Sequence, residues 1–294
     1  MKIFVTGGTG FIGKFLVSRL NNEKNKILIL TRNPINLERS KNASFVEGDL
    51  SNMDKWIDRL RKFKPDTTVH LAWEGIPDYS CQNSIKNLKY SLDLIQLLAK
   101  IGCRTILVTG TLWEYGSQKG KLSEEMQVNP FNVFTAAKNA LNLLGSEIAK
   151  EYKMNFIWAR LFYVYGPGLK RDSLISYLIR CAKEDIKPGI RNPNAQNDFI
   201  YVEDVADAIC QILLKCKKSE VFNIGSGKLT SVQYIIEKIF QYLGRKKDYE
   251  VSSKQQLDLL PSSYADISKI KKEIGWKPKV NIDEGIQKIL ATSP

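Results

Sequence analysis

Three glycines near the N-terminus stand at a spacing that suits phosphate binding. They lie in Gly7-Gly8-Thr9-Gly10-Phe11-Ile12-Gly13, which follows the strand-like run Lys2–Thr6 and precedes the helix-like segment Lys14–Leu20. Glycines at this spacing let the chain turn sharply, bring backbone N–H groups close to a pyrophosphate, and pack the helix tightly on the sheet. The pattern therefore predicts a dinucleotide site. Its predicted contacts are Gly7, Gly10, Phe11, Ile12 and Gly13.

The residue that follows the next strand-like run indicates which dinucleotide is bound. Arg32 comes directly after Ile27–Thr31, and the nearest acidic residue downstream is Glu38. An acidic side chain at this point would bond to the ribose hydroxyls of NAD, whereas an arginine can pair with the 2′-phosphate of NADP. The sequence therefore favours NADP(H) over NAD(H), with Arg32 as the contact to that phosphate.

Strands and helices alternate through the first half of the chain, and these elements must position the dinucleotide site. The strand-like runs are Ile27–Thr31, Ala43–Glu47, Thr67–Ala72, Thr105–Thr109 and Asn155–Leu161. The helix-like segments are 14–22, 52–63 with Ser51 as its N-cap, 84–101, and Phe134–Tyr152. Such alternation is typical of βαβ units. It predicts an α/β fold with a doubly wound parallel sheet (Rossmann-like), in which ligands bind beyond the carboxyl ends of the strands.

The pattern becomes less regular after Tyr165-Gly166-Pro167-Gly168. Helices are predicted at 173–184, 203–215 and 230–243, and short strands at Phe199–Val202 and Val221–Ile224. We interpret residues 1–168 as a dinucleotide-binding domain that also takes strands from about 198–225. Residues 169–294 are then a smaller substrate-binding lobe that is interwoven with it.

Composition excludes several classes of protein. The 294 residues are 43% hydrophobic and 26% charged, which is typical of a water-soluble globular protein, and no run approaches the ~18 apolar residues of a membrane span. The apolar N-terminal residues already form the first strand, so no signal peptide is expected and the protein is predicted to be cytoplasmic. Five cysteines without a C-x-x-C pair fit reduced thiols. A single histidine, His70, lies in an apolar run typical of a buried strand end, and no metal site is predicted.

The formal net charge of +13 bears on the partner. Such a charge suits an anionic small molecule. Nucleic acid is a further hypothesis that ranks last, because no basic motif with interleaved aromatic residues occurs. Most lysines fall on segments with helical periodicity, which favours a solvated, lysine-rich surface.

Further short motifs follow in order along almost the whole chain. They are Gly48-Asp49-Leu50, His70-Leu71-Ala72, Asn87, Thr109-Gly110-Thr111 with Tyr115-Gly116, Lys138, Arg160 to Gly168, Asp198 to Val205, Phe222 to Gly227 and Gly275 to Pro278. Together with the glycine-rich turn, this set resembles the extended short-chain dehydrogenase/reductases. They are also called the NAD-dependent epimerase/dehydratase family, and the resemblance is to the branch that modifies nucleotide sugars.

The resemblance implies roles for particular residues. The implied cofactor contacts are Asp49 and Leu50 at the adenine, Leu71 and Ala72 beside the dinucleotide, and Lys138 at the nicotinamide ribose. Thr111 is implied to bond to the reacting oxygen, so Thr111 and Lys138 are the predicted catalytic residues. The resemblance also implies a nucleotide sugar as substrate, a role in surface-polysaccharide biosynthesis, and a homodimer formed through the helices near 84–101 and 134–152.

One departure from the family concerns its proton donor. Members carry Tyr-x-x-x-Lys on the long helix, and here the matching segment is Phe134-Thr135-Ala136-Ala137-Lys138. Phenylalanine has no proton to transfer. In one hypothesis another group supplies the acid; the candidates are Thr111, Glu114, Tyr115, Thr135 and Tyr163. The alternative is a catalytically silent protein that binds the cofactor as a sensor or scaffold.

Another departure concerns the reaction. The family's 4,6-dehydratases place Asp-Glu directly after the active threonine, and these positions are Leu112 and Trp113 here. Glu114 comes one residue late, and a continued strand would point it to the opposite face. Dehydration is therefore disfavoured, which leaves 4-keto reduction or epimerisation. The NADP preference favours reduction.

A third departure concerns the substrate. Where the family uses an asparagine and two arginines to hold the nucleoside diphosphate, this chain has Tyr163, Asn197 and Leu260. Lys170, Arg171 and Arg191 are nearby cations that could replace the arginines. The equal alternative is a substrate that carries less phosphate than is usual in the family. An aromatic wall of Trp113, Tyr163 and Tyr165 could face a sugar or base, although core packing is the commoner fate of such residues. The predicted substrate contacts are Trp113, Tyr163 and Arg191.

Overall fold

The chain divides into two interleaved compact units. The computed structural model describes residues 1–294 except 22–23, 35–40, 170–172, 247–248, 252–260 and 293–294. Unit 1 consists of Met1–Glu114, Gln127–Arg160 and Ala206–Phe222. Unit 2 consists of Tyr115–Met126, Leu161–Val205 and Asn223–Pro294. The chain therefore passes from one unit to the other several times.

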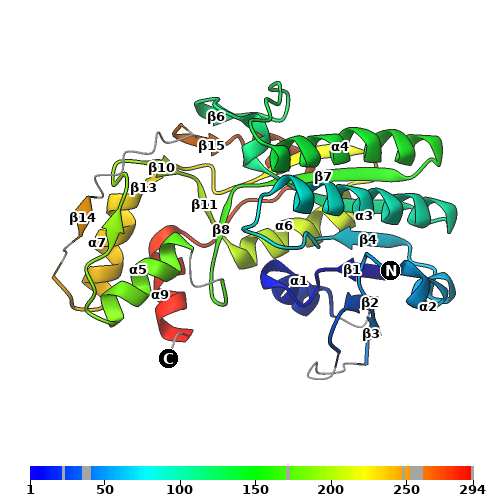
Figure 1. The fold of residues 1–294 in the computed structure, drawn as a ribbon, viewed down its shortest axis with the longest axis horizontal. Coiled ribbons are helices and arrows are strands. Elements are labelled where there is room, and N and C mark those ends of the chain that lie inside the picture. The colour runs from blue at the N-terminus through cyan, green and yellow to red at the C-terminus, as the bar shows by residue number, and fades with distance from the viewer. Residues whose placement is uncertain (22–23, 35–40, 170–172, 247–248, 252–260, 293–294) are drawn as a thin grey trace. The chain divides into compact units, whose positions relative to one another are not determined.

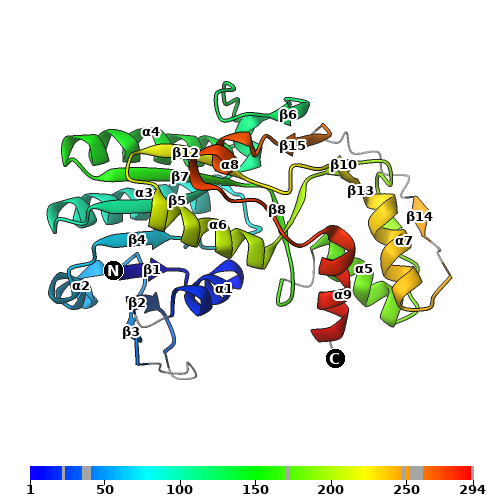
Figure 2. The ribbon, with the colours of Figure 1, turned by 180° about the vertical axis from the view of Figure 1, so that it is seen from behind.

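A seven-stranded sheet forms the centre of unit 1, with strand order β12-β7-β5-β4-β1-β2-β3 (Figure 1, with β5 and β12 labelled in Figure 2). Its strands are β1 (Lys2–Thr6), β2 (Lys26–Thr31), β3 (Ala43–Glu47), β4 (Thr67–His70), β5 (Thr105–Thr111), β7 (Asn155–Leu161) and β12 (Glu220–Ile224). The pairs β1–β2, β2–β3, β1–β4 and β4–β5 are parallel. The strand order reverses between β1 and β4, which is where doubly wound sheets bind their ligands. The predicted fold class is confirmed.

Helices cover both faces of this sheet. They are α1 (Phe11–Leu20), α2 (Ile57–Phe63), α3 (Cys81–Lys100), α4 (Val133–Glu151) and α6 (Val202–Lys215). Apolar side chains of α2, α3 and α4 share one buried core with alternate residues of the strands, among them Phe4 and Leu28. The intervening strand residues point to the other face, where Arg19 of α1 lies 2.9 Å from Asp207 of α6. Figure 2 shows α6 over this second face.

The helix that carries Lys138 begins and packs in a defined way. Asn132 is the N-cap of α4, and its side chain and that of Thr135 form a capping box. Further along the helix, a Cβ added at Gly145 would lie 2.8 Å from the ring of Phe156 and 3.0 Å from Ile95 of α3. Glycine at this position therefore lets α4 lie close to both β7 and α3.

The start predicted for the second helix is wrong. The α2 helix begins at Ile57, after a short 3₁₀ turn, η1, over Met53–Lys55. Ser51 does not cap it, because both its backbone N–H and its hydroxyl bond to the carboxylate of Asp49. This local turn occupies the hydroxyl that a helix cap would need.

Unit 2 combines short strands with four helices among its described residues. The strands are β6 (Gly120–Leu122), β8 (Tyr163–Tyr165), β9 (Gly189–Ile190), β10 (Gln196–Asn197), β11 (Phe199–Tyr201), β13 (Thr230–Ser231), β14 (Glu250–Val251) and β15 (Ser263–Ala265). The helices are α5 (Leu174–Lys183), α7 (Val232–Tyr242), α8 (Ser268–Ile274) and α9 (Ile282–Thr292). Apolar faces of α5, α7 and α9 form the core of this unit. None of the helices in the described part of the chain is long and apolar enough to cross a membrane.

The buried carboxylate of Asp198 ties three segments of unit 2 together. It accepts hydrogen bonds from the N–H groups of Ser226 at 2.7 Å, Gly227 at 2.9 Å and Ala265 at 3.0 Å. The hydroxyl of Ser226 is a fourth donor, at 2.6 Å. A carboxylate can accept this many bonds, so no lone pair of the buried group needs water. Asp198 therefore has an architectural role.

Candidate active site

The glycine-rich turn approaches the neighbouring strand too closely for a side chain. Gly7 has φ +71°, and a Cβ built there would lie 2.8 Å from the backbone nitrogen of Ala72. At Gly13 a Cβ would lie 2.1 Å from the carbonyl oxygen of Gly7, so α1 packs directly on the turn. Gly10 closes the turn through its N–H, which donates to the Gly7 oxygen at 3.0 Å. These contacts explain the glycines at positions 7 and 13, whereas a Cβ at Gly10 would make only a tight contact, 3.1 Å from the Gly7 oxygen.

The N-terminus of α1 is arranged to attract an anion. Gly10 is its N-cap, no side chain among the described residues caps the first N–H groups, and the first turn carries no acidic residue. Phe11 and Ile12 form the start of this turn and are half-buried. The positive end of the helix dipole and the uncapped N–H groups therefore remain for a ligand.

His70 is a structural residue at the end of β4. Its Nδ1 lies 2.7 Å from the hydroxyl of Thr6, and its Nε2 lies 3.0 Å from the hydroxyl of Ser91. Ser91 donates its own proton to the carbonyl of Asn87, so Nε2 must be the protonated nitrogen. Burial, and to a smaller extent the charge of Lys138, lower the pKa of His70 to about 3. This neutral imidazole fixes the strand end from which Leu71 and Ala72 continue.

Charged side chains cluster where β2 and β4 end. The guanidinium of Arg32 lies 2.9 Å from one carboxylate oxygen of Glu74, and the ammonium of Lys86 lies 2.7 Å from the other. Nearby, hydrogen bonds from Ser51 lower the pKa of Asp49, and the charge of Arg32 lowers it further. Leu50 follows Asp49 and packs against the core of unit 1. The Arg32 side chain is 70% exposed, so its guanidinium remains accessible to a ligand.

Lys138 is buried beneath the end of β5. Its Nζ donates to the carbonyl oxygen of Thr109 at 2.8 Å and lies 3.9 Å from the ring centre of Trp73. Burial lowers the pKa of Lys138 to about 7, while the carboxylate of Glu114 acts in the opposite direction. The aromatic face and the carbonyl both favour the charged ammonium. Lys138 is therefore a cation that is poised near neutral pH.

Glu114 anchors the turn that carries Thr111. The turn, η2, is a 3₁₀ helix over Leu112–Tyr115, so the expectation of a continued strand there is wrong. Glu114 is fully buried and accepts bonds from Nε of Arg160 at 2.9 Å and Nε1 of Trp158 at 3.0 Å. A Cβ at Gly110 would lie 2.3 Å from its Oε1, so the glycine makes room for the carboxylate. The same oxygen accepts the N–H of Thr111 at 2.8 Å.

Several residues suggested as a replacement acid are occupied in structural bonds. The phenol of Tyr115 is fully buried and donates to Asn223 at 2.8 Å. The hydroxyl of Thr135 donates to the Asn132 carbonyl at 3.0 Å as part of the helix cap. Glu114 is held by its three donors. Thr111 is half-buried, and its hydroxyl oxygen accepts only a long bond, of 3.3 Å, from the N–H of Trp113 among the interactions of the described residues.

An aromatic cluster surrounds Phe134. Its ring centre lies 4.8 Å from that of Tyr79, 5.6 Å from Trp73 and 6.1 Å from Trp113. Phe131 extends the cluster at 6.1 Å from Trp113. Sequence reasoning missed Tyr79, which lies in the loop between β4 and α3 and has no periodic pattern around it. Its position soon after His70-Leu71-Ala72 is the signal that could have drawn attention to it.

The other predicted substrate contacts belong to unit 2. Tyr163 is in β8, with its ring centre 5.8 Å from that of Phe199, and Arg191 is exposed just after β9. Tyr165 is buried in the core of unit 2, and its phenol donates to the carbonyl of Asn281 at 3.2 Å. An aromatic wall that includes Tyr165 is therefore wrong, because its ring is used in packing. Glu38, Lys170, Arg171 and Leu260 lie outside the described residues.

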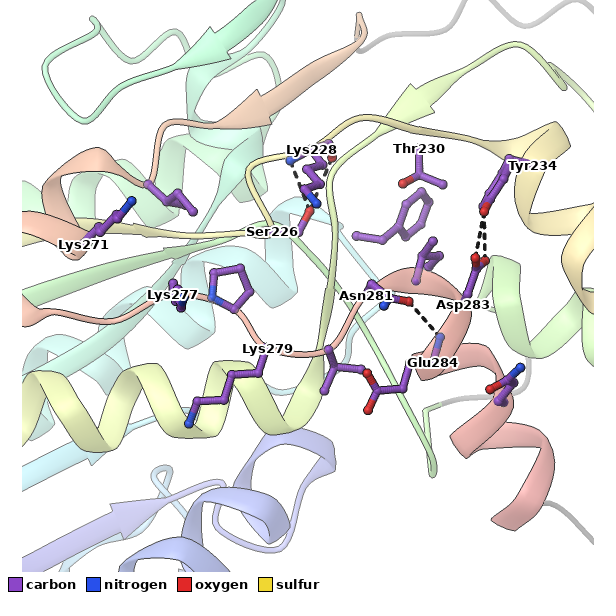
Figure 3. Close-up of a pocket in the computed structure, with 16 residues that line it drawn as sticks. Ser226, Lys228, Thr230, Tyr234, Lys271, Lys277, Lys279, Asn281, Asp283 and Glu284 are labelled. Atoms are coloured by element: carbon purple, nitrogen blue, oxygen red, sulfur yellow. Dashed lines mark hydrogen bonds between the residues drawn. The ribbon is translucent and has the colours of Figure 1, made fainter.

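Unit 2 also contains a cavity of about 820 Å³ with a positive lining (Figure 3). Four lysines of the part of the chain that the structure describes line it: Lys228, Lys271, Lys277 and Lys279. Its acidic lining residues are Asp283, which accepts a hydrogen bond from Tyr234 at 2.9 Å, and Glu284. The lysines outnumber the acids, so the potential in this cavity favours anions.

Comparison with known proteins agrees with the geometry. The model of the NAD dependent epimerase/dehydratase family matches residues 3–225, and the chain belongs to this family. It is 30% identical to the uncharacterized protein MJ1055 of Methanocaldococcus jannaschii, over 97% of this chain and 94% of that one. It is 28% identical to the UDP-glucuronate 4-epimerase of Thermodesulfobacterium geofontis, over 97% and 93%. The structure of UDP-glucuronic acid 4-epimerase from Bacillus cereus in complex with NAD is similar, with TM-score 0.86, 25% identity and coverage of 99% of both chains.

Proposed function

We propose that this protein is an NADPH-dependent reductase of a nucleotide-activated sugar that carries a ketone at C4. The observation that carries the proposal is the buried ammonium of Lys138, which lies 2.8 Å from the Thr109 carbonyl near the end of β5. Family membership supports a nicotinamide dinucleotide and a nucleotide sugar, since a relative is named as a UDP-glucuronate 4-epimerase. The role in surface-polysaccharide biosynthesis is part of the same proposal.

The glycine-rich turn fits the pyrophosphate of a dinucleotide. The turn lacks side chains where backbone meets backbone, and the first N–H groups of α1 have no side-chain cap. Gly7, Gly10 and Gly13 would hold the pyrophosphate at the positive end of the helix. Asp49 and Leu50 would contact the adenine, and Leu71 and Ala72 would line the other side of the dinucleotide.

Arg32 supports NADP(H) over NAD(H). No acidic side chain occupies the described residues that directly follow β2, and Arg32 and Lys86 both reach Glu74 at that end of the sheet. A 2′-phosphate would pair with Arg32 in competition with Glu74, and a phosphate dianion is the stronger partner. Because exposed ion pairs contribute little to stability, exchanging the Glu74 partner costs little.

The chain's own residues would orient the sugar and hold protons. A bound reduced nicotinamide supplies a hydride. Lys138 would hold the ribose and stabilise negative charge, and Thr111 would bond to the sugar oxygen that reacts. Leu112 and Trp113 occupy the positions where dehydratases of the family carry acidic residues. No group is therefore assigned to remove a proton at sugar carbon 5, and reduction is favoured over dehydration. Trp113, Tyr163 and Arg191 are proposed to contact the substrate.

A homodimer formed through α3 and α4 is also proposed. Ile85 on α3 is 56% exposed, and Leu143 and Leu144 on α4 are 60% and 50% exposed. Large apolar side chains on neighbouring helices favour association with a second copy. Light scattering of Leu143→Glu/Leu144→Glu tests this: we expect a monomer where the wild type is a dimer. A monomeric wild type would contradict the proposal.

Turnover of a substrate panel tests the proposed activity. NADPH consumption is measured by loss of the dihydronicotinamide absorbance with a series of UDP- and dTDP-4-keto sugars, and the products are identified by mass spectrometry. We expect one sugar to be reduced, with a mass increase of two hydrogens. UDP-glucuronate, which carries an alcohol at C4, is assayed beside the 4-keto sugars, and its conversion to the C4 epimer without net NADPH consumption would instead identify an epimerase. Binding of NADPH without turnover of any sugar would contradict both.

A further inference from the structure

The position that carries the family's proton donor is filled here by a ring that contacts a tyrosine. The Phe134 ring centre lies 4.8 Å from that of Tyr79, with the two planes inclined by 49°. Tyr79 also packs 5.2 Å from Trp113, which directly follows the Thr111–Leu112 segment. A phenol therefore enters the same aromatic cluster from a different element, the loop between β4 and α3.

This loop is held by side chains of α3. The side-chain amide nitrogen of Asn83 donates to the backbone carbonyl oxygens of Glu74 at 2.8 Å and Asp78 at 2.9 Å. The amide of Asn87 is bidentate on Glu74, accepting its N–H at 2.7 Å and donating to its carbonyl at 3.0 Å. Gly75 has φ +89° and would clash with Asn83 if it carried a Cβ. A loop whose backbone is fixed in this way can hold the side chain of Tyr79 in a defined position for proton transfer.

The electrostatic setting keeps Tyr79 protonated at neutral pH. Tyr79 is half-buried, and burial raises the pKa of its phenol. Lys138 lies under Trp73, which is itself 5.6 Å from Phe134 in the same cluster. Lys138 therefore reaches this cluster through Trp73. The partial exposure of Tyr79 gives water access to reprotonate it.

We propose that Tyr79 donates the proton to the reacting sugar oxygen, in place of the tyrosine that the family carries at position 134. This inference rests on the proposed reductase function. The O–H bond of Tyr79 breaks as its proton bonds to the carbonyl oxygen, while the hydride supplied by the bound reduced nicotinamide bonds to the carbonyl carbon. The ketone is reduced to an alcohol, the nicotinamide is oxidised, and the phenolate takes a proton from water.

Kinetics of matched variants test this role. In Tyr79→Phe the ring and its packing remain and only the hydroxyl is lost, so we expect kcat to fall by about 10²–10⁴-fold with KM changed less. The control is Tyr152→Phe, the same change at a side chain 43% exposed beyond α4, which should leave kcat unchanged. The double variant Tyr79→Phe/Phe134→Tyr should regain activity, because it restores a phenol in the family's position. Thermal unfolding of each variant shows that it is folded.

Chemical modification gives a readout that does not depend on turnover. N-acetylimidazole acetylates accessible phenols, and peptide mass spectrometry reads the extent at each tyrosine. We expect Tyr79 to be protected when NADP⁺ and UDP-glucuronate are both bound, while Tyr152 is modified equally with and without them. If the wild type is active but Tyr79→Phe matches the Tyr152→Phe control, or Tyr79 is not protected, this inference is overturned and the reductase function stands. If neither cofactor nor nucleotide sugar binds, both are overturned.

Discussion

The guanidinium Nε of Arg160 lies 2.9 Å from the carboxylate Oε2 of Glu114, and both side chains are almost completely buried. Trp158 gives the same carboxylate a further hydrogen bond, at 3.0 Å. The pair lies beneath Gly110, and the other oxygen of Glu114 holds the N–H of Thr111. A buried ion pair thus fixes the strand end that carries a predicted catalytic hydroxyl.

Removing one charge of this pair should destabilise the protein strongly. Glu114→Gln keeps the size of the side chain but removes the charge that faces the buried cation of Arg160, which costs about 3–5 kcal/mol. The free energy of unfolding, measured by urea denaturation, gives the value. The control is Asp58→Asn, which breaks an exposed pair with Arg61 at 3.3 Å and should cost less than about 1 kcal/mol. Equal losses of unfolding free energy in the two variants would show that burial does not increase the contribution of the Glu114–Arg160 pair to stability.

Substitution in the glycine-rich turn should separate cofactor binding from backbone strain. Gly7→Ala places a Cβ 2.8 Å from the Ala72 nitrogen, whereas Gly102→Ala has a similar positive φ, +81°, and nothing within 4 Å. Both variants should lose about 1 kcal/mol of stability through the left-handed backbone, and Gly7→Ala should lose more because its Cβ also clashes with the backbone of Ala72. Only Gly7→Ala should weaken NADPH binding. Its Kd should rise by about tenfold or more, because the Cβ displaces the loop that holds the pyrophosphate. Calorimetric Kd values check this, and equal affinities in both variants would place the pyrophosphate elsewhere.

The choice between the two dinucleotides should depend on Arg32. Arg32→Ala should raise the Kd of NADPH by about 10- to 150-fold while that of NADH changes little, since a charge-assisted bond to phosphate contributes about 1.5–3 kcal/mol. Glu74→Gln should tighten NADPH binding, because it removes the competing partner 2.9 Å from Arg32. Arg61→Ala on α2 is the control for loss of an exposed arginine. Tighter binding of NADH than NADPH by the wild type would refute the preference.

The buried ammonium of Lys138 should make stability depend on pH. Its pKa is about 7 in the folded protein against an ordinary value of 10.5, so between these values the unfolded chain binds one proton more. The contribution of Lys138 to the free energy of unfolding therefore rises with pH from about 7 to 10.5. Below pH 7 this contribution does not change with pH. Lys138→Met lacks this slope, so its stability relative to the wild type should be greatest below pH 7. Urea denaturation across this pH window measures the difference in free energy of unfolding between the two proteins. Parallel plots of that free energy against pH would mean that folding does not shift the pKa of Lys138.

The sequence was sufficient for the elements of the sheet, because local signals specify them. The apolar runs that form β3 and β7 lie at the predicted residues, and the glycine pattern marks the turn into α1. Ser51 shows where local signals fail: two structures compete for one hydroxyl, and the bond to Asp49 is formed instead of a helix cap. Residue type alone does not show which alternative is lower in free energy.

The parts of the site that could not be predicted depend on contacts between distant segments. Glu114 pairs with Arg160, 46 residues away, because the 3₁₀ turn points the carboxylate beneath Gly110. Tyr79 reaches Phe134 because Asn83 and Asn87 fix its loop. Neither arrangement has a periodic sequence pattern, since each is set by the strand order that brings β4, β5 and β7 together. Resemblance to a family locates the motifs, but not the groups that replace an altered one.

Binding of a pyridine dinucleotide at the turn of Gly7, Gly10 and Gly13 is the central claim. Isothermal titration calorimetry of the purified protein with NADPH, NADP⁺, NADH and NAD⁺ tests it directly. We expect one site per chain, with the phosphorylated pair bound more tightly and binding weakened in Gly7→Ala. Absence of binding heat for all four dinucleotides at more than one temperature would contradict the account.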